Sequence, residues 1–489
     1  MFATTIVGGS SAFSQYNRTD HFDGAVSTLR RCASPSSAGE HHALIVSLRS
    51  LRDPTLRPFF ESLTRSSHWS SRVDGILGLA ELSTPNDIDA KLVLALPAIE
   101  DRSTAIRNAV GLRLLQPATI LELLKSADLP RLDRVVLNAE LHRQGMKMEG
   151  SGLEDAAADP SDEIAGLATA LLMESGNTVQ WDRFAERLKT RSPEVANAAM
   201  QELGRAVLLY SVRAPIARIA ETTGGDTYAL PTRMIVTGSA LALDPALGQR
   251  EWRKLVEKER GQAALVRAGL QLMSQISGVE PGNGSVLRNG EPLVEAIADA
   301  IDANASGDPV ALATALEVVI DRANRPSAEW AVKRAAGLPP LLAARVWRHL
   351  LTYFLTAPFN TPALSGSVLD CATRLAMVDA GAIETMIKSA ADERQVQEIF
   401  ILALCNASTP EAADVAARMR GSLSRRGDAL AILAVARGRP TLEPELLTDL
   451  GIAAAGGGDL DPTLLVQAAW LFARHSGRGE QALSQIGVK

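Results

Sequence analysis

Apolar residues recur along this chain at the spacing of one helical face, and the stretch from Ser192 to Arg205 shows the pattern in full. Ser192 can cap a helix, Pro193 suits the first helical position because its missing N–H would be unpaired there, and Glu194 favours the positive helix end. Apolar residues then fall at i, i+3, i+4 and i+8, at Val195, Ala198, Ala199 and Leu203. The sequence therefore predicts an amphipathic helix whose apolar stripe packs against a neighbouring helix.

Related stripes return at intervals of about thirty residues. Along the first half they are separated by 33, 26, 32 and 31 residues and begin at Val73, Ile106, Leu132, Ile164 and Val195. Near the C-terminus they are separated by 33 and 36 residues and begin at Val396, Ala429 and Leu465. A period of this length, with a helix and a turn in each unit, is typical of stacked helical repeats, in which no unit buries its apolar face alone.

A second repeated signal is a capping side chain directly before proline, which marks the start of a helix. Aromatic residues make up only 4% of the chain, so Leu, Ala, Val and Ile must fill the interior, which suits closely packed helices. Both features predict an all-α protein. The capping signal occurs at eight places: Asp53-Pro54, Thr84-Pro85, Asp159-Pro160, Ser192-Pro193, Asp244-Pro245, Asp308-Pro309, Thr409-Pro410 and Asp461-Pro462.

Three segments show the repeat most clearly: DPTLRPFFESL, SSRVDGILGLAEL and SPEVANAAMQELGR. They resemble HEAT-type repeats of the armadillo-like α-solenoid superfamily. The resemblance is to a repeat rather than to one protein, and it covers residues 40–220 and 393–475. In the middle of the chain, only the apolar periodicity indicates the repeat. The resemblance implies a right-handed α-α superhelix, a solenoid of stacked antiparallel helix pairs that usually holds protein partners on a curved surface.

Composition along the chain predicts four segments. Residues 1–38 mix Gly, Ser and Thr without sustained helical periodicity and are expected to form a flexible leader. Residues 39–277 and 293–489 carry the N-terminal and C-terminal helical repeats. Between them, residues 278–292 are rich in Gly, Asn and Pro, so a loop or joint is expected there.

Charge and cysteine usage favour a cytoplasmic protein. A net charge of −6 argues against a global attraction to nucleic acid, and no apolar run reaches the ~20 residues of a membrane span. Three distant cysteines form neither a disulfide framework nor metal knuckles, and the N-terminus lacks the basic region of a secretory signal. Export is the alternative. The cysteines are Cys32, Cys371 and Cys405.

No motif for catalysis, metal binding or cofactor binding is recognised. The seven histidines are scattered, and only His41 and His42 are adjacent, where neighbours on a helix diverge by about 100°. The acidic run from Glu154 to Glu163 lacks the spacing and central glycine of a calcium loop, and helix capping explains it. The run Gly456-Gly457-Gly458 lacks the following Lys-Ser/Thr of a phosphate cradle, so a turn is expected.

Aromatic residues are densest between positions 347 and 359, where arginine and histidine are interleaved with them. Such a mixture can stack a base or anchor a peptide, but neighbouring leucines favour a core segment. Both interpretations remain open. The residues are Trp347, Tyr353, Phe354 and Phe359, with Arg345, Arg348 and His349.

Arginine is concentrated in one predicted hairpin of an otherwise acidic protein, with few acidic residues nearby in sequence. Two arginines end the first helix, two lie in the turn and two end the second helix, so a positive strip that binds a partner is one hypothesis. A solvated face is the other, because cations are favoured at helix C-termini. The candidate partner-binding residues are Arg418, Arg420, Arg425, Arg426, Arg437 and Arg439.

These observations favour a non-enzymatic scaffold or adaptor that binds a protein partner along a curved α-solenoid surface. The alternative is a HEAT-like enzyme or accessory factor acting on nucleic acid or on a bound pigment or cofactor, as alkylpurine DNA glycosylases and bilin lyases do. That alternative rests on fold analogy. It would require aromatic and carboxylate side chains that converge on a basic face. The identity of the partner and the oligomeric state do not follow from the sequence.

Overall fold

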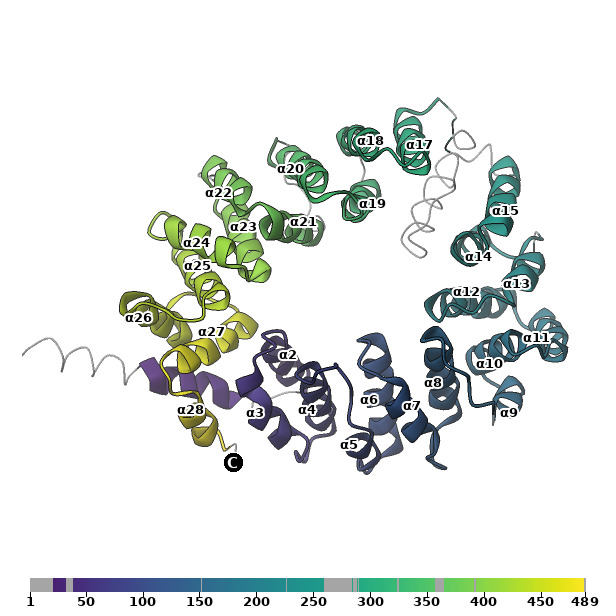
Figure 1. The fold of residues 1–489 in the computed structure, drawn as a ribbon, viewed down its shortest axis with the longest axis horizontal. Helices are drawn as coiled ribbons and strands as arrows, with labels where there is room; N and C mark the ends of the chain where they lie inside the picture. The colour runs from purple at the N-terminus through teal and green to yellow at the C-terminus, as the bar shows by residue number, and fades with distance from the viewer. Residues whose placement is uncertain are drawn as a thin grey trace, which may run out of the picture. The chain divides into compact units, whose positions relative to one another are not determined.

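The computed structural model describes residues 21–31, 38–150, 152–225, 227–258, 284, 288, 290–322, 325–356, 365–390 and 393–487. These residues form helices joined by short turns, and no strand occurs among them, so the all-α prediction is confirmed. Consecutive helices pack against each other (Figure 1). The chain divides into two compact units, Met1–Leu92 with Phe354–Lys489, and Val93–Tyr353, which are described separately below.

The first unit combines the two ends of the chain. Its N-terminal part consists of helical residues 21–31, α2 (Ala38–Arg49), the short 3₁₀ turn η1 (Pro54–Leu56), α3 (Arg57–Leu63) and α4 (Trp69–Glu81). Its C-terminal part consists of α21 (Ser365–Val378), α22 (Ala380–Ser389), α23 (Arg394–Ala407), α24 (Pro410–Met419), α25 (Arg425–Gly438), α26 (Pro444–Ile452), the π turn η4 (Ala453–Gly457), α27 (Pro462–His475) and α28 (Gly479–Gln485). The boundaries between the two units fall within two further helices, α5 (Ala90–Leu94) and α20 (Pro340–Thr356).

The second unit contains α6 (Ile99–Gly111), α7 (Pro117–Leu124), α8 (Arg131–Arg143), α9 (Leu153–Ala157), α10 (Asp162–Glu174), α11 (Val179–Lys189), α12 (Pro193–Leu209), α13 (Ile216–Thr223), α14 (Leu230–Leu243) and α15 (Pro245–Lys258). It also contains α17 (Pro292–Ala305), α18 (Pro309–Asp321) and α19 (Arg325–Ala335). Helices α6, α8, α10, α12 and α14 each contact the next member of this series, so they form one row, as Figure 1 shows.

The repeat is visible in the backbone where the helices of this row end. After α6, α8, α10 and α12 a residue adopts positive φ, at positions separated by 32, 31 and 35 residues. At the first of them the N–H of Leu114 donates to the carbonyl of Ala109 at 2.8 Å, the bond that closes a Schellman motif. The same bond recurs after each of the other three helices, so four consecutive units share one termination geometry. The positive-φ residues are Arg113, Gly145, Gly176 and Ser211.

Six of the eight predicted proline starts begin a helix or a 3₁₀ turn. In each, the side chain before the proline accepts a hydrogen bond from a backbone N–H of the first turn. The exceptions are Thr84-Pro85, which lies in the turn after α4, and Asp159-Pro160, whose proline lies two residues before α10 begins at Asp162. In these two places the proline belongs to the connection rather than to the helix. The six capping residues are Asp53, Ser192, Asp244, Asp308, Thr409 and Asp461.

The prediction that Val195, Ala198, Ala199 and Leu203 form the buried face of α12 is wrong in part. Val195 is 45% exposed and Ala198 is exposed, whereas Leu203 is buried as expected. The buried face is rotated from the predicted one, because α12 packs against both α10 and α14, and Gly204 lies against Ile235 and Val236 of α14. The buried residues of α12 are Ala196, Met200, Leu203, Gly204 and Val207.

Helices from the N-terminal and C-terminal parts of the sequence share a core within the first unit, where α2 packs against α27 (Figure 1). The Ser47 hydroxyl donates to the Thr463 carbonyl at 2.6 Å, and the Gln467 amide donates to the Ser47 carbonyl at 3.1 Å. The buried carboxylate of Asp53 accepts hydrogen bonds from Trp470 Nε1 at 2.9 Å and from Arg474 at 3.2 Å. An open stack would keep its end helices apart, so this contact was not expected.

Part of the predicted leader is ordered. Residues 21–31 form a helix whose buried side chains, Phe22, Ala25, Val26 and Leu29, follow helical spacing. The Thr28 hydroxyl lies 3.3 Å from the carbonyl of Ala454, so this helix packs onto the η4 turn. Residues 1–20 lie outside the described part, as does most of the predicted joint at 278–292, which stays a prediction.

Candidate functional site

A groove of about 510 Å³ runs across three helices of the second unit. Its floor is α10 and its walls are α8 and α12, which contact α10 from either side. Most of the lining is aliphatic. The apolar side chains are Leu132 and Val136 of α8, Leu167 of α10, and Ala199, Leu203, Ala206, Leu208 and Leu209 of α12.

Polar contacts hold the C-terminal ends of α8 and α12 together over α10. The ring nitrogen Nε2 of His142, on α8, donates to the carbonyl of Ser211 after α12 at 3.2 Å. The carboxylate of Glu174, which ends α10, accepts the backbone N–H groups of Arg213 at 2.8 Å and of Ala214 at 2.7 Å. These bonds fix the geometry of the groove, because they join the ends of the three helices that line it.

The α12 wall is partly open to solvent. Leu209 is 48% exposed, Ala199 and Ala206 are half-buried, and Leu203 is buried, all at helical spacing along the groove. Two residues of the predicted α12 stripe, Ala199 and Leu203, therefore line the groove. The sequence indicated an apolar face here, but its period could not tell a face that packs in the core from one that remains open.

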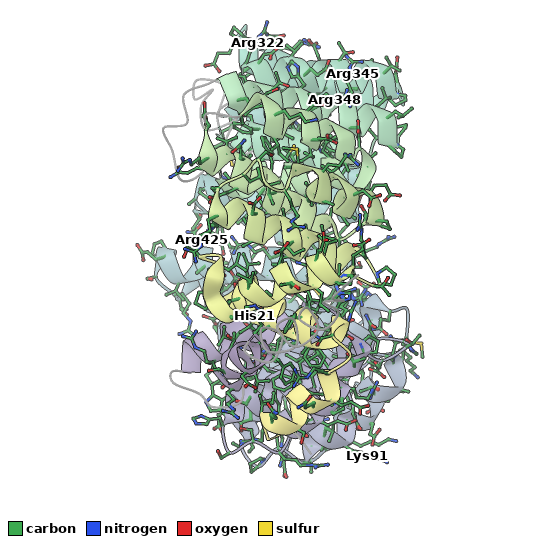
Figure 2. All side chains as sticks on the ribbon, turned by 90° about the vertical axis from the view of Figure 1, so that its left-hand side faces the viewer. His21, Lys91, Arg322, Arg345, Arg348 and Arg425 are labelled. Atoms are coloured by element: carbon green, nitrogen blue, oxygen red, sulfur yellow. The ribbon has the colours of Figure 1, made fainter. Side chains whose placement is uncertain are left out.

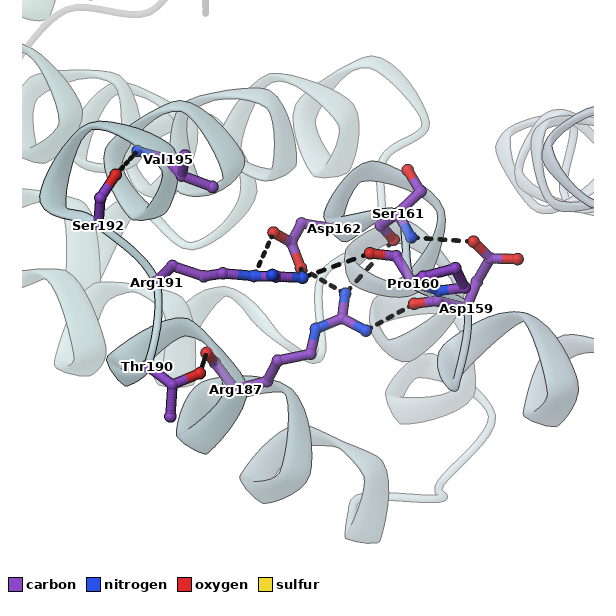
Figure 3. A network of polar contacts seen from close by, with 9 residues as sticks. All are labelled: Asp159, Pro160, Ser161, Asp162, Arg187, Thr190, Arg191, Ser192 and Val195. Carbon is purple, nitrogen blue, oxygen red and sulfur yellow. Dashed lines mark hydrogen bonds and ion pairs between the residues drawn. The ribbon is translucent and has the colours of Figure 1, made fainter.

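An acidic rim borders the groove at the start of α10. Asp162 lines the groove and forms ion pairs with Arg187 of α11 at 2.5 Å and with Arg191, in the connection that follows α11, at 3.1 Å (Figure 3). Arg187 also donates to the carbonyl of Asp159 at 2.5 Å, so it links α11 to the turn that precedes α10. The rim is thus fixed to the helix behind it, and the exposed Glu163 adds a further carboxylate to the lining.

Tyr210 closes one end of the groove next to a buried charge cluster. Glu140 is fully buried and pairs with Arg143 at 2.7 Å and with Arg113 at 3.3 Å. Burial, together with the nearby Glu140 carboxylate, raises the pKa of Tyr210 to about 12. The phenol is therefore neutral at physiological pH. It can donate a hydrogen bond to a bound ligand, and it does not serve as a base.

The six predicted partner-binding arginines lie on and beside the α24–α25 hairpin, and most are engaged by neighbouring helices. Arg418 pairs with Glu384 of α22 at 2.6 Å, and Arg439 pairs with Asp414 of α24 at 2.7 Å. Their partners stand 34 and 25 residues away in sequence. The arginine-rich sequence therefore does not correspond to a surface of uncompensated positive charge.

The remaining four arginines divide between the two ends of α25. At its start, Arg426 lies 3.4 Å from Glu398, Arg420 pairs with Asp449 of α26, and Arg425 has an exposed side chain. At its other end Arg437 donates to the Gln467 side chain at 3.4 Å. Arg420 and Arg425 line one cavity of about 470 Å³ between α25, α26 and η4.

The aromatic cluster of the sequence belongs mainly to the core. Trp347 and Phe354 are buried, and the Trp347 indole donates to the carbonyl of Val332 at 3.2 Å. Arg345 pairs with Glu317 at 2.8 Å and His349 with Asp321 at 2.8 Å, and both acidic residues lie on α18. These contacts favour the packing interpretation over the stacking of a base. Phe359 lies outside the described residues.

Among the residues that the structure describes, no three His, Cys, Asp or Glu side chains converge as metal ligands would. His41 bonds to the Ser71 hydroxyl at 3.2 Å, and His42 bonds to the buried carboxylate of Asp74 at 2.7 Å. The two histidines therefore connect α2 to α4. None of the described helices combines the length and the apolar character needed to cross a membrane.

No known family, curated protein or solved structure matches this chain. The geometry alone therefore ranks the candidate sites. The apolar groove of α8, α10 and α12, called the α8–α12 groove below, ranks above the arginine hairpin, because Leu209 is exposed within it and Leu132, Ala199, Ala206 and Leu208 are partly exposed, whereas the hairpin arginines have intramolecular partners.

Proposed function

We propose that this chain is a HEAT-like helical-repeat scaffold that binds a protein partner and catalyses no reaction. The proposal is supported by consecutive helix pairs, by the recurring Schellman ends of α6, α8, α10 and α12, and by sequence segments similar to HEAT repeats. A right-handed superhelix and a cytoplasmic location are parts of the same proposal, and export is its alternative. A stack of this kind presents side chains from several units along one row, which suits the binding of an extended partner.

The observation that carries the proposal is the α8–α12 groove. An apolar groove between helices accepts the apolar face of an amphipathic helix, whose anchor residues at i, i+3 or i+4 and i+7 enter one after another. The volume of about 510 Å³ accommodates several such side chains. Leu209 would contact them directly, since it is exposed within the groove, and Tyr210 would supply a hydrogen-bond donor at its end.

Site-specific photo-crosslinking tests this function. A photoreactive amino acid at Leu209 is expected to give a discrete crosslinked partner in cells that express the protein. A photoreactive residue at Val179 is the control, because Val179 is also an exposed aliphatic residue, at 61%, but lies on α11 outside the groove. The partner should be lost in a Leu209→Asp variant and retained in Val179→Asp. Equal crosslinking from both positions would refute the groove as the binding site.

The arginine hairpin remains a second proposed contact surface. Arg425 and Arg418 have exposed side chains, which an acidic partner could reach. Arg425→Glu tests this surface, because Arg425 is exposed at the start of α25. Binding that uses this surface should weaken in Arg425→Glu and also weaken as salt rises. Action on nucleic acid or on a bound pigment has less support, since Trp347 and Phe354 are buried.

A further inference from the structure

The cavity between α25, α26 and η4 combines an apolar floor with a charged rim, and it is separate from the α8–α12 groove. Its apolar side consists of Ala429 and Ile432 from α25 and Ile452 and Ala453 from α26 and η4. Ile452 is 43% exposed, so part of this apolar surface is open to solvent. A volume of about 470 Å³ falls within the ~300–1,000 Å³ typical of small-molecule sites.

Close backbone packing shapes the floor of this cavity. Gly458 follows the η4 turn and lies so near Ala429 that a Cβ built on it would stand 2.2 Å from the Ala429 Cβ. The preceding Gly456 has a φ of 91°, a conformation that glycine adopts readily. The triple-glycine segment is therefore a turn, as its sequence suggested, and this turn forms one wall of the cavity.

The charged rim holds two arginines, Arg420 and Arg425, and two aspartates, Asp428 and Asp449. Asp449 already accepts a bond from Arg420, and Asp428 accepts the backbone N–H of Gly421 at 2.9 Å. A guanidinium carries five N–H donors, more than one carboxylate can accept. Two guanidinium groups therefore bring more donors to the rim than its two carboxylates can accept. Arg425 contributes to it from an exposed position that a ligand can reach, as Figure 2 shows at the surface of the hairpin.

We infer that this cavity binds a small amphiphilic anion, with a carboxylate or phosphate group at Arg420 and Arg425 and an apolar body over Ile432 and Ile452. Planar guanidinium groups hold either anion through paired hydrogen bonds, which are stronger than bonds between neutral groups. The apolar body covers the open surface of Ile452. This ligand site goes beyond the proposed scaffold function and does not depend on it.

The inference is tested by calorimetric titration of the full-length protein with four probes that separate the two halves of the ligand. The probes are 2-naphthoate, 2-naphthyl phosphate, the neutral 2-naphthamide and inorganic phosphate. At least one naphthyl anion should bind, and naphthamide and inorganic phosphate should each bind at least tenfold more weakly. The stronger of the two anions identifies the natural headgroup as a carboxylate or a phosphate.

Two variants and a matched control locate the binding. Arg425→Gln and Ile452→Asp should each weaken the naphthyl anion at least tenfold, because one removes the guanidinium and the other places a carboxylate beside the apolar body. Arg439→Gln changes a paired arginine at the far end of α25 and should leave binding unchanged. Circular dichroism checks that all three remain folded. Absence of binding at millimolar probe, equal binding of naphthamide, or equal loss in Arg439→Gln would overturn the inference.

Discussion

Replacing Trp470 with phenylalanine tests whether the two ends of the chain stabilise each other. Trp470 is 1% exposed and its indole N–H donates to Asp53 at 2.9 Å. Asp53 lies at the start of η1, where it also accepts hydrogen bonds from the backbone N–H of Thr55 at 3.0 Å and from its hydroxyl at 2.6 Å. The tryptophan therefore joins the C-terminal α27 to a carboxylate that caps the N-terminal η1 turn.

The expected loss of stability has two parts. A hydrogen bond to a charged group contributes about 1.5–3 kcal/mol, and Trp470→Phe removes one such bond. The smaller ring also leaves unfilled volume, which adds a cavity term. Trp252 separates these two parts, because it is equally buried but its Nε1 has no hydrogen-bond partner among the described residues. Trp252→Phe should lose the volume term but no hydrogen bond, and the removal of an unpaired buried N–H offsets part of that loss, so Trp470→Phe should cost at least about 1.5–3 kcal/mol more.

The free energy of unfolding is measured by denaturant titration, together with hydrogen exchange in α2 and α27. Trp470→Phe should increase exchange in both helices, although they stand at opposite ends of the sequence. Combining it with Asp53→Asn should give a coupling energy of about 1–3 kcal/mol in a double-mutant cycle. If the two substitutions were additive, or if exchange rose in α27 alone, the reasoning that Asp53 and Trp470 form one interaction would be refuted.

The remaining predictions use contacts within single units. Gly75→Ala should cost about 1–3 kcal/mol, because its new Cβ would lie 2.7 Å from the Phe60 carbonyl, whereas Gly111→Ala meets nothing within 4 Å and should be neutral or slightly stabilising in thermal melts. Met200→Asp should unfold the region around α12, since Met200 is fully buried, while Val195→Asp should change the melting temperature little; comparable losses would refute the assigned face. Burial raises the pKa of Asp53, but hydrogen bonds from Thr55, Trp470 and Arg474 outweigh burial and hold the pKa below its ordinary value. Its contribution to stability is thus present above about pH 4 and is lost as the pH falls through the folded pKa, so Asp53→Asn should flatten the acid limb of the stability curve.

The helical repeat was predictable from sequence because its signals are local. A capping residue before proline and an apolar period of 3.6 act within one or two turns, so they survive in the structure at Ser192, Asp308, Thr409 and Asp461. The helix start predicted at Thr84-Pro85 was wrong because proline is equally suited to a turn. The dipeptide alone does not distinguish a turn from a helix start.

The candidate sites were less predictable because they depend on contacts between units. One hypothesis from the sequence was a positive strip on the arginine hairpin, because few acidic residues lie nearby in sequence. In the structure Arg418 pairs with Glu384 and Arg420 with Asp449, which lie 34 and 29 residues away. The exposed face of α12 was missed for a similar reason. Which side of an apolar helix is covered depends on where its neighbours lie, and the α12 period is compatible with both arrangements.

In the proposed helical stack, the contact between α2 and α27 would solve a problem that stacked repeats face. In a stack, each unit covers the apolar face of the next, so the first and last units would expose theirs unless special capping units with a polar outer face were added. Here α2 and α27 cover each other, which allows Leu44, Ile45 and Leu48 of α2 to be almost fully buried. Because both helices lose that cover when they separate, truncating either end should weaken the other. Local repeat signals do not specify such a contact, since its partners stand more than 400 residues apart, 417 for Asp53 and Trp470.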